Sequence, residues 1–132
     1  MAVARESRLI VGCCVMKERS WRAMQEFVDR LGEAQRYCSD GLDVYQELMW
    51  SPSSQHVISK FKSKFKEETH TIESMNADLR TYLGRLKRRS RCFSRSWEAL
   101  AKAVRLFTWY YNKRRRIILQ HPKYRNGLPL YF

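Results

Sequence analysis

The hydrophobic pattern of this chain changes near Thr69, and this change constrains the fold more than any other feature of the sequence. Before it, apolar residues come in short runs, such as the β-branched run RLIVGCCV that begins at Arg8. After it, apolar residues recur at helical spacing in two long segments rich in Arg and Lys. Short runs are typical of buried strands, whereas a period of about 3.6 residues is typical of amphipathic helices. The pattern therefore predicts an α/β portion followed by two long basic helices.

The α/β portion is predicted to alternate strands and helices. The segment AVARES is expected to be the end of a hairpin partner, and RLIVGCCV a central strand buried on both faces. The segment SWRAMQEFVDRLG is predicted to form a helix with Ser20 as its N-cap and Gly32 as its C-cap. A strand in QRYCSDG, a short helix in DVYQELM, a strand in QHVIS and a loop in KFKSKFKEE follow. This order indicates a mainly parallel sheet.

Each basic helix is predicted from an apolar stripe. The stripe of the first helix consists of Ile72, Met75, Leu79, Tyr82, Leu83 and Leu86. The segment SRCFSRS then interrupts the pattern, with Ser94 or Ser96 as the next N-cap. The stripe of the second helix consists of Trp97, Leu100, Val104, Phe107 and Tyr111. We therefore expect an α/β portion over residues 1–70, a basic helical portion over 71–120 packed on the same domain, and an irregular tail over 121–132.

The charge of the chain is concentrated in its second half. Residues 1–70 carry 11 basic and 10 acidic side chains, whereas residues 71–132 carry 15 basic and 3 acidic ones, for a total net charge of +13. Such an excess favours a polyanionic partner, most often nucleic acid, over the alternatives of solubility or an anionic membrane surface. The aromatic residues of the basic half fit either nucleic-acid binding or a core: Trp97, Phe107, Trp109, Tyr110, Tyr111 and Tyr124.

Cysteine spacing and hydropathy indicate the compartment. The four cysteines form no C-x-x-C pair and no zinc-ligand pattern with the three histidines, so we expect them to be reduced in a cytoplasmic protein. No apolar run is long enough to cross a membrane, and no membrane partner is expected.

Two carboxylates stand out by their places in the pattern. Asp40 comes where a predicted parallel strand ends, which is where sites form in open α/β sheets, although Asp-Gly by itself favours a simple turn. Glu73 comes at the expected start of the first basic helix, where an acid by itself favours the helix dipole. Together they suit Mg²⁺ or Mn²⁺, because Mg²⁺ binds through few carboxylates plus substrate phosphates. Two such ions about 3.5–4 Å apart can hold both oxygens of a phosphodiester exchange.

Basic residues accompany Glu73. At about 100° per residue, Asn76, Arg80 and Lys87 cluster with Glu73 on one flank of the apolar stripe. The runs RLKRRSR and NKRRRI add further cations that we expect to contact phosphates and so to position DNA without reading its sequence. The predicted DNA-binding residues are Arg80, Lys87, Arg88, Arg89 and Arg91.

Four segments of the chain resemble a known family: YCSDGLDVYQEL, QHVISK, THTIESMNADLRTYLGRLKRRSRCFSRSWEAL and AVRLFTWYYNKRR. They are similar to the C-terminal part of the catalytic domain of DDE-class insertion-sequence transposases, in particular the family of the first-named insertion sequence. The resemblance runs from about Arg8 to Asn112. It implies a partial ribonuclease-H-like domain, with a short mixed or parallel sheet that lacks the first strand, followed by two long basic helices.

The resemblance also implies roles for particular residues. In this fold three acids hold two Mg²⁺ ions, and Asp40 matches the second acid while Glu73 matches the third. Arg80 matches a basic residue seven places after the third acid, which contacts DNA at the transposon end. The first acid belongs on a strand before RLIVGCCV, and no Asp precedes that run. We therefore expect a truncated or separately translated fragment that is weakly active or inactive alone.

The expected function is DNA transposition by metal-dependent phosphodiester cleavage and strand transfer. The expected partners are transposon-end and target DNA, with full-length transposase or further copies of the chain, in the prokaryotic cytoplasm at the nucleoid. Two alternatives stay open: a non-enzymatic basic DNA-binding protein, such as an inhibitor of transposase assemblies, and an inert remnant.

Overall fold

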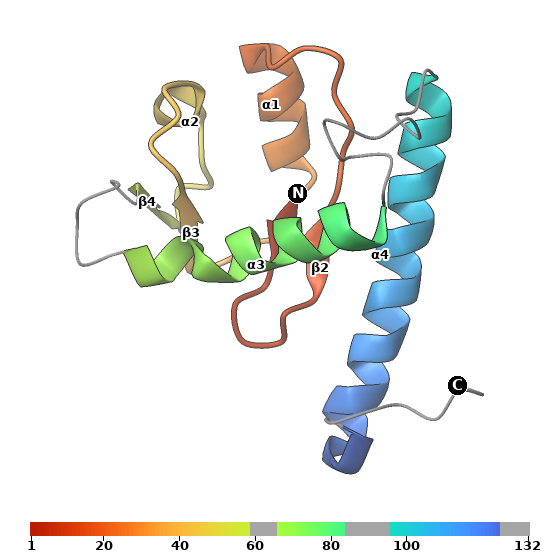
Figure 1. Cartoon of the computed structure of the whole chain (residues 1–132). Helices are drawn as coiled ribbons and strands as arrows, with labels where there is room; N and C mark the ends of the chain where they lie inside the picture. Colours follow the sequence, from red (N-terminus) through yellow and green to blue (C-terminus); the bar gives the residue numbers. More distant parts are fainter. Residues whose placement is uncertain (59–65, 84–95, 125–132) are drawn as a thin grey trace. The chain divides into compact units, whose positions relative to one another are not determined.

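The computed structural model describes residues 1–58, 66–83 and 96–124, and it is α/β (Figure 1). The chain divides into two compact units. The terminal unit combines residues 1–15 with residues 77–132, and the central unit consists of residues 16–76. Among the described residues, no helix is both long enough and apolar enough to span a bilayer.

The terminal unit begins with a β-hairpin. Strand β1 (Ala2–Val3) pairs antiparallel with β2 (Ile10–Gly12), which confirms the hairpin partner expected in AVARES. The turn between them contains Arg8, whose φ of 56° lies in the left-handed region and whose N–H donates to the Ala4 carbonyl at 2.8 Å.

The central-strand prediction for RLIVGCCV is wrong. Only three of its residues form a strand, and in the part of the chain that the structure describes this strand pairs with β1 alone. Ile10 is 5% exposed while Val11 is 56% exposed, so β2 alternates between a buried and an open face. The physical reason is that an antiparallel hairpin can pack one face on the core and leave the other face in solvent. A strand must be apolar on both faces only where both faces are buried.

Helix α4 (Trp97–Gln120) is the second predicted basic helix. Ser96 is its N-cap and accepts a hydrogen bond from the Ala99 N–H, which decides between the two serines proposed from sequence. Glu98 lies in the first turn, where a negative charge is favourable. The helix ends at Gln120 with His121 as its C-cap, and a short 3-10 helix, η2 (Pro122–Tyr124), follows.

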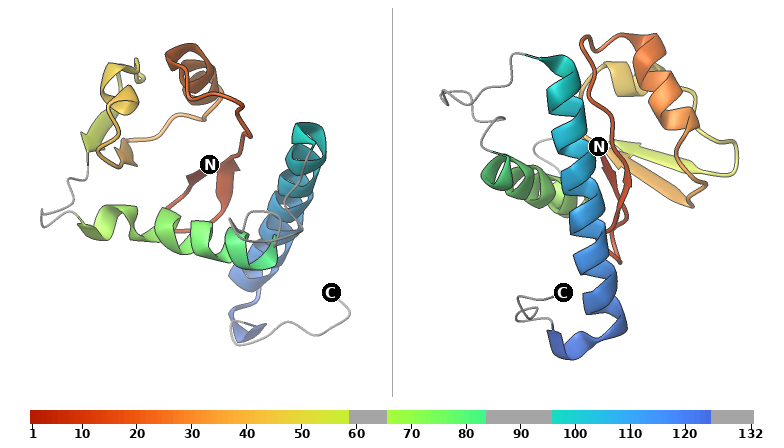
Figure 2. Two further views of the ribbon diagram at one scale, coloured as in Figure 1. Left: turned by 45° about the horizontal axis from the view of Figure 1, so that its top comes forward. Right: turned by 90° about the vertical axis from the view of Figure 1, so that its right-hand side faces the viewer.

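Side chains of α4 hold the hairpin. The Asn112 amide donates to the Ile10 carbonyl at 2.8 Å and accepts from the Ile10 N–H at 2.9 Å. The Arg115 Nε donates to the Ser7 carbonyl at 2.8 Å. Because the Leu9 carbonyl bonds to Ala4 on the β1 side, the Ile10 N–H points to the other edge of β2, and Asn112 covers that edge. Figure 2 shows the hairpin beside α4 in its right-hand view.

The end of α3 (Lys66–Tyr82) also belongs to the terminal unit from Ala77 onward. The Tyr82 ring lies 6.2 Å from that of Phe107, which in turn lies 5.9 Å from that of Tyr111. Burial raises the pKa of Tyr111, Arg115 lowers it, and Asp78 on α3 raises it again. These ring contacts confirm that Phe107 and Tyr111 lie on the apolar stripe of α4. Tyr82 was predicted to lie on the apolar stripe of α3, but its side chain is largely exposed.

The central unit begins with α1 (Trp21–Asp29). Ser20 caps it as predicted, its side chain accepting from the Ala23 N–H. The helix ends at Asp29 with Arg30 as its C-cap, and therefore before the predicted cap Gly32. Gly32 does not adopt a positive φ, so the left-handed termination that favours glycine is not used here.

A parallel strand pair follows α1. Strand β3 (Arg36–Ser39) pairs with β4 (Gln55–Ile58), with Arg36 opposite Gln55 and Ser39 opposite Ile58. The short helix α2 (Val44–Glu47) lies in the crossover between them. This confirms the parallel pairing predicted from QRYCSDG and QHVIS. The prediction of a single, mainly parallel sheet is wrong for the described residues, because β1–β2 and β3–β4 form two separate two-stranded sheets.

The core of the central unit lies between α1, α2 and the segment that follows α2. Its buried residues are Met24, Val28 and Leu48, against which Met16, Val44, Tyr45 and Trp50 pack. The side-chain amide of Gln25, itself 7% exposed, bonds both backbone groups of Met49 at 2.9 Å. The Trp21 indole N–H donates to the Glu47 carbonyl at 3.2 Å. These bonds attach the irregular segment after α2 to α1.

Helix α3 begins earlier than predicted. It starts at Lys66, so the last residues of the predicted loop KFKSKFKEE are helical; residues 59–65 lie outside the described part. Met75, from the predicted stripe, is buried. Leu86 lies outside the described residues, and so does the predicted interruption SRCFSRS except for its last residue, Ser96.

Candidate functional site

Asp40 follows directly on the last residue of β3. Its Oδ1 accepts a hydrogen bond from the Leu42 N–H at 3.3 Å, and the side chain is exposed. This is the local turn that an Asp-Gly pair favours, and it holds the carboxylate at the carboxyl end of a parallel strand. The turn uses one carboxylate oxygen and keeps the group accessible to solvent. A metal role for Asp40 stays a prediction.

A polar and aromatic cluster supports this strand end. The Ser39 hydroxyl donates to the Asp40 carbonyl at 3.1 Å and lies 2.9 Å from Nε2 of His56 on β4. The direction of the bond between Ser39 and His56 depends on the tautomer of the imidazole. The His56 ring stacks on Trp50 with centroids 4.2 Å apart, and burial lowers the pKa of His56. The Tyr37 ring lies 4.9 Å from that of Trp50.

The negative charge of Asp40 affects the pKa of Tyr45 on α2. Burial raises the pKa of Tyr45 above its ordinary value, the negative charge of Asp40 raises it further, and Arg19 lowers it. Tyr45 therefore stays a neutral phenol near this carboxylate at physiological pH.

Glu73 lies in the middle of α3 and not in its first turn. The helix begins at Lys66, so the dipole explanation for Glu73 loses its basis, because that effect falls off within the first turn. The side chain is exposed, and Glu73 belongs to the central unit together with Asp40. Within residues 1–58, 66–83 and 96–124, no group of three or more His, Cys, Asp and Glu could hold a metal ion. That Asp40 and Glu73 share a cation stays a prediction.

The predicted DNA-binding residues divide into two sets. Arg80 is exposed in the last turn of α3. It follows Glu73 by seven residues, so both side chains leave an ideal helix in nearly the same direction, about 20° apart. The remaining predicted contacts lie outside the described residues: Lys87, Arg88, Arg89 and Arg91.

The exposed side of α4 carries a basic and aromatic face, which includes cations of the run NKRRRI, expected from the sequence to contact phosphates. The exposed residues of this helix include Lys102, Arg105, Leu106, Trp109, Tyr110, Lys113, Arg114 and Arg116. The Lys113 ammonium lies 5.3 Å from the Trp109 ring centroid, and the Arg114 guanidinium lies 5.7 Å from that of Tyr110. The helical period could have found this face, because Trp109 and Lys113 fall opposite the stripe of Val104 and Tyr111. Trp109 and Tyr110 are thus surface residues and not core.

Comparison with known proteins defines the class. The chain matches a family of transposases, which are enzymes that transfer DNA segments. The family is described as IS1 transposase, and the match covers residues 5–119. The chain belongs to the IS1 transposase family, which confirms the resemblance inferred from its motifs. No curated protein and no solved structure matches it. Family membership implies DNA binding, in agreement with the net charge of +13.

Proposed function

We propose that this chain acts in DNA transposition as a DDE-type transposase, in which Asp40 and Glu73 hold divalent cations. The observation that carries the proposal is the position of Asp40 at the carboxyl end of β3 in a parallel pair, in a chain of the IS1 transposase family. The order of an antiparallel hairpin, a helix and a parallel pair supports a partial ribonuclease-H-like arrangement.

The donor chemistry of the two acids fits Mg²⁺ or Mn²⁺. Both side chains are exposed carboxylates of the central unit, and hard divalent cations prefer such oxygens. Asp40 and Glu73 would therefore hold the ion. A bound pair of such ions supplies activation of a water or hydroxyl nucleophile and stabilisation of charge on the phosphodiester oxygens.

The neighbouring residues of this chain have supporting roles in the proposal. Ser39 and His56 fix the strand end that carries Asp40, through hydrogen bonds of 3.1 and 2.9 Å. Arg80 contacts the DNA backbone at the transposon end. Further cations contact other phosphates and so position DNA without specifying its sequence. These cations are Lys87, Arg88, Arg89 and Arg91.

Metal binding in the absence of DNA tests this function. Mn²⁺ binding is measured by isothermal titration calorimetry for the whole chain and for Asp40→Asn and Glu73→Gln. Each substitution is expected to weaken Mn²⁺ binding by about tenfold or more, because even outer partners of metal ligands contribute about 10–100-fold. Asp43→Asn is the matched control, because the Asp43 side chain is exposed and makes no capping hydrogen bond on α2.

A second function is favoured by one observation. The basic face of α4 is exposed and its cations need neither Asp40 nor Glu73 to bind a polyanion. Under this alternative the chain is a non-enzymatic DNA-binding protein, such as an inhibitor of transposase assemblies. DNA affinity would then fall with a log–log salt slope of about −0.9 per phosphate contact, and Mn²⁺ would not bind at all. Unchanged Mn²⁺ binding in both acid variants would exclude the metal role of these residues.

A further inference from the structure

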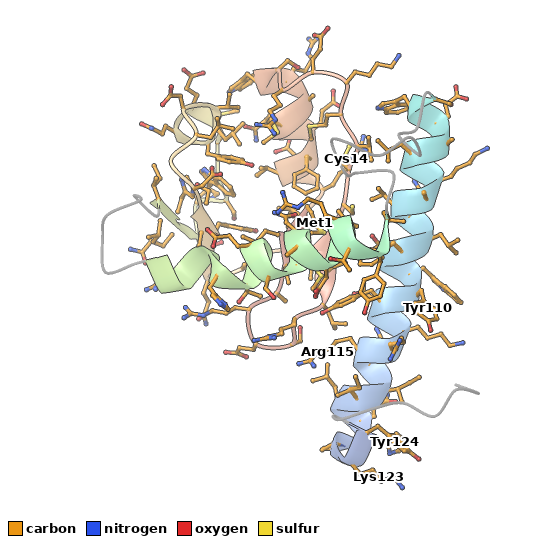
Figure 3. The ribbon with its side chains drawn as sticks, viewed as in Figure 1. Met1, Cys14, Tyr110, Arg115, Lys123 and Tyr124 are labelled. Carbon is orange, nitrogen blue, oxygen red and sulfur yellow. The ribbon has the colours of Figure 1, made fainter. Side chains whose placement is uncertain are left out.

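Helix α4 presents two different faces. Its inner face contacts the hairpin through Asn112 and Arg115 and includes the buried Val104. At about 100° per residue, six of the eight exposed residues between positions 102 and 116 fall within an arc of about 100° whose centre lies about 150° from Val104, and Asn112 lies at the border of this arc. We call this the outer face, and it consists of Lys102, Arg105, Leu106, Trp109, Lys113 and Arg116. In Figure 3, Tyr110, at the border of this face, and Arg115 project from different sides of α4.

The composition of the outer face is unusual for a solvated helix surface. Trp109 is 60% exposed and Leu106 is 67% exposed, although both are large and apolar. Tyr110 at the border is 48% exposed. Four cations share the face with these rings, and the only acid of α4 is Glu98 in the first turn. Exposed aromatic rings alternating with cations are what proteins use to bind single-stranded nucleic acid.

We propose that the outer face of α4 binds an unpaired DNA strand, with Trp109 stacking on a base and the four cations contacting phosphates. The inference rests on the proposed function for its DNA substrate, because cleavage and transfer of strands exposes unpaired nucleotides, but it does not depend on the metal site. Lys102 and Lys113 are separated by about 16 Å along the helix axis, so the cations can follow a strand across the ring between them.

The ring argues for an unpaired strand rather than a duplex. Within a duplex, the faces of the bases are covered by their neighbours, and proteins read only the base edges in the grooves. An unpaired base offers its face, and stacking of a base on an aromatic ring contributes about 1–3 kcal/mol. The Lys113 ammonium, 5.3 Å from the Trp109 ring centroid, is placed to contact a phosphate next to a stacked base.

Charge and pattern argue against two other occupants. A second copy of the same face would bring the four cations against four more, and such like-charge contact is unfavourable. A helix that lies on a membrane surface needs a continuous apolar face toward the lipid. Here the apolar residues Val104 and Phe107 lie on the inner side, and on the outer face cations separate Leu106 and Trp109.

The test compares two DNA forms with matched variants of the chain. Fluorescence anisotropy measures binding of a labelled oligothymidine and of a mixed-sequence duplex of equal length. Trp109→Ala is expected to weaken oligothymidine binding by about 5- to 100-fold, in line with the loss of one stacked base, and duplex binding less than about twofold. Trp109→Phe is expected to retain most of the affinity, because it keeps a ring. The double substitution Lys113→Ala and Arg116→Ala is expected to weaken both forms and to lower the salt slope by about 2.

Controls make the outcomes distinct. Arg22→Ala removes an exposed cation on α1 of the central unit and should leave the ratio of the two affinities unchanged. Equal oligothymidine binding by Trp109→Ala and the unsubstituted chain would overturn the proposal, and so would equal weakening of both DNA forms. Binding to phosphatidylglycerol vesicles that Trp109→Ala abolishes, without an effect on oligothymidine, would assign the face to membranes instead. Mn²⁺ titration without DNA tests the acids independently, so either proposal can fail alone.

Discussion

The side-chain amide of Asn112 on α4 closes two hydrogen bonds, of 2.8 and 2.9 Å, on the backbone of Ile10 in β2. An asparagine from the end of the sequence thereby takes the place of a strand neighbour for a residue near its beginning. Gln25 does the same for Met49 in the central unit, with two bonds of 2.9 Å. In both units a carboxamide, which offers a donor and an acceptor together, satisfies backbone groups that regular structure leaves unpaired.

Removal of the Asn112 amide should destabilise the protein. Asn112→Ala leaves the N–H and the carbonyl of Ile10 without these partners, and we expect the free energy of unfolding to fall by about 2–3 kcal/mol. Urea denaturation followed by circular dichroism measures the change. Gln120→Ala, at an exposed position of the same helix, is the control and should stay within about 0.5 kcal/mol. A loss for Asn112→Ala no larger than that of the control would show that the amide does not hold the hairpin.

The equivalent substitution in the central unit tests the second carboxamide. Gln25→Ala should lower the free energy of unfolding by about 2 kcal/mol, because Met49 then loses partners for both of its backbone groups. Gln46→Ala on α2 removes an exposed carboxamide and serves as the comparison. Hydrogen exchange at the Met49 amide gives a local readout, and it should speed up in Gln25→Ala alone. Unchanged exchange there would contradict the role assigned to Gln25.

Strand β2 should tolerate a hydroxyl on one face only. Ile10→Thr places a polar group at a position that is 5% exposed and should cost about 2 kcal/mol of stability. Val11→Thr keeps the branched shape at an exposed position and should change the stability by less than about 0.5 kcal/mol. Thermal denaturation of the two variants side by side measures the difference. Equal losses would mean that β2 is covered on both faces, as its continuous apolar run first suggested.

The stability of the protein should fall in mildly acidic solution because of His56. Burial lowers its folded-state pKa below the ordinary 6.5, so the unfolded chain binds a proton more readily than the folded one. The contribution of this neutral histidine is therefore complete above pH 6.5 and is lost as the pH falls through the folded-state pKa. Urea midpoints between pH about 7.5 and 5 should drop more in the unsubstituted chain than in His56→Gln. Parallel curves for the two proteins would refute the assignment.

Local patterns predicted much of what the two units contain. Ser20 was recognisable as an N-cap, and Ser96 as one of two candidates, because a hydroxyl before an apolar-periodic segment satisfies helix N–H groups within three residues. The parallel pairing of β3 and β4 followed from the alternation of strands with helices. Asp40 could be placed at a strand end from the residues on either side of it, and its turn is of the kind that Asp-Gly favours.

Other features depend on partners far along the chain. The run RLIVGCCV has the composition of a strand that is covered on both faces, yet its burial depends on which elements pack against it. Within the part of the chain that the structure describes, Val11 is 56% exposed. The start of α3 at Lys66 moves Glu73 away from the first turn, and nothing in the charged segment before it signalled the earlier start. Trp109 and Tyr110 have the composition of core residues, and only the direction in which α4 packs makes them a surface.

The sequence by itself determined the class of this protein, its transposase family, its excess of positive charge and the starts of α1 and α4, because these depend on composition, motifs and contacts within a few residues. The tertiary structure alone decided which side of each element is covered and which distant residue satisfies which backbone group. The pairs of Asn112 with Ile10 and of Gln25 with Met49 have no local signature, since an amide side chain bonds whatever unpaired backbone group the folded chain brings to it.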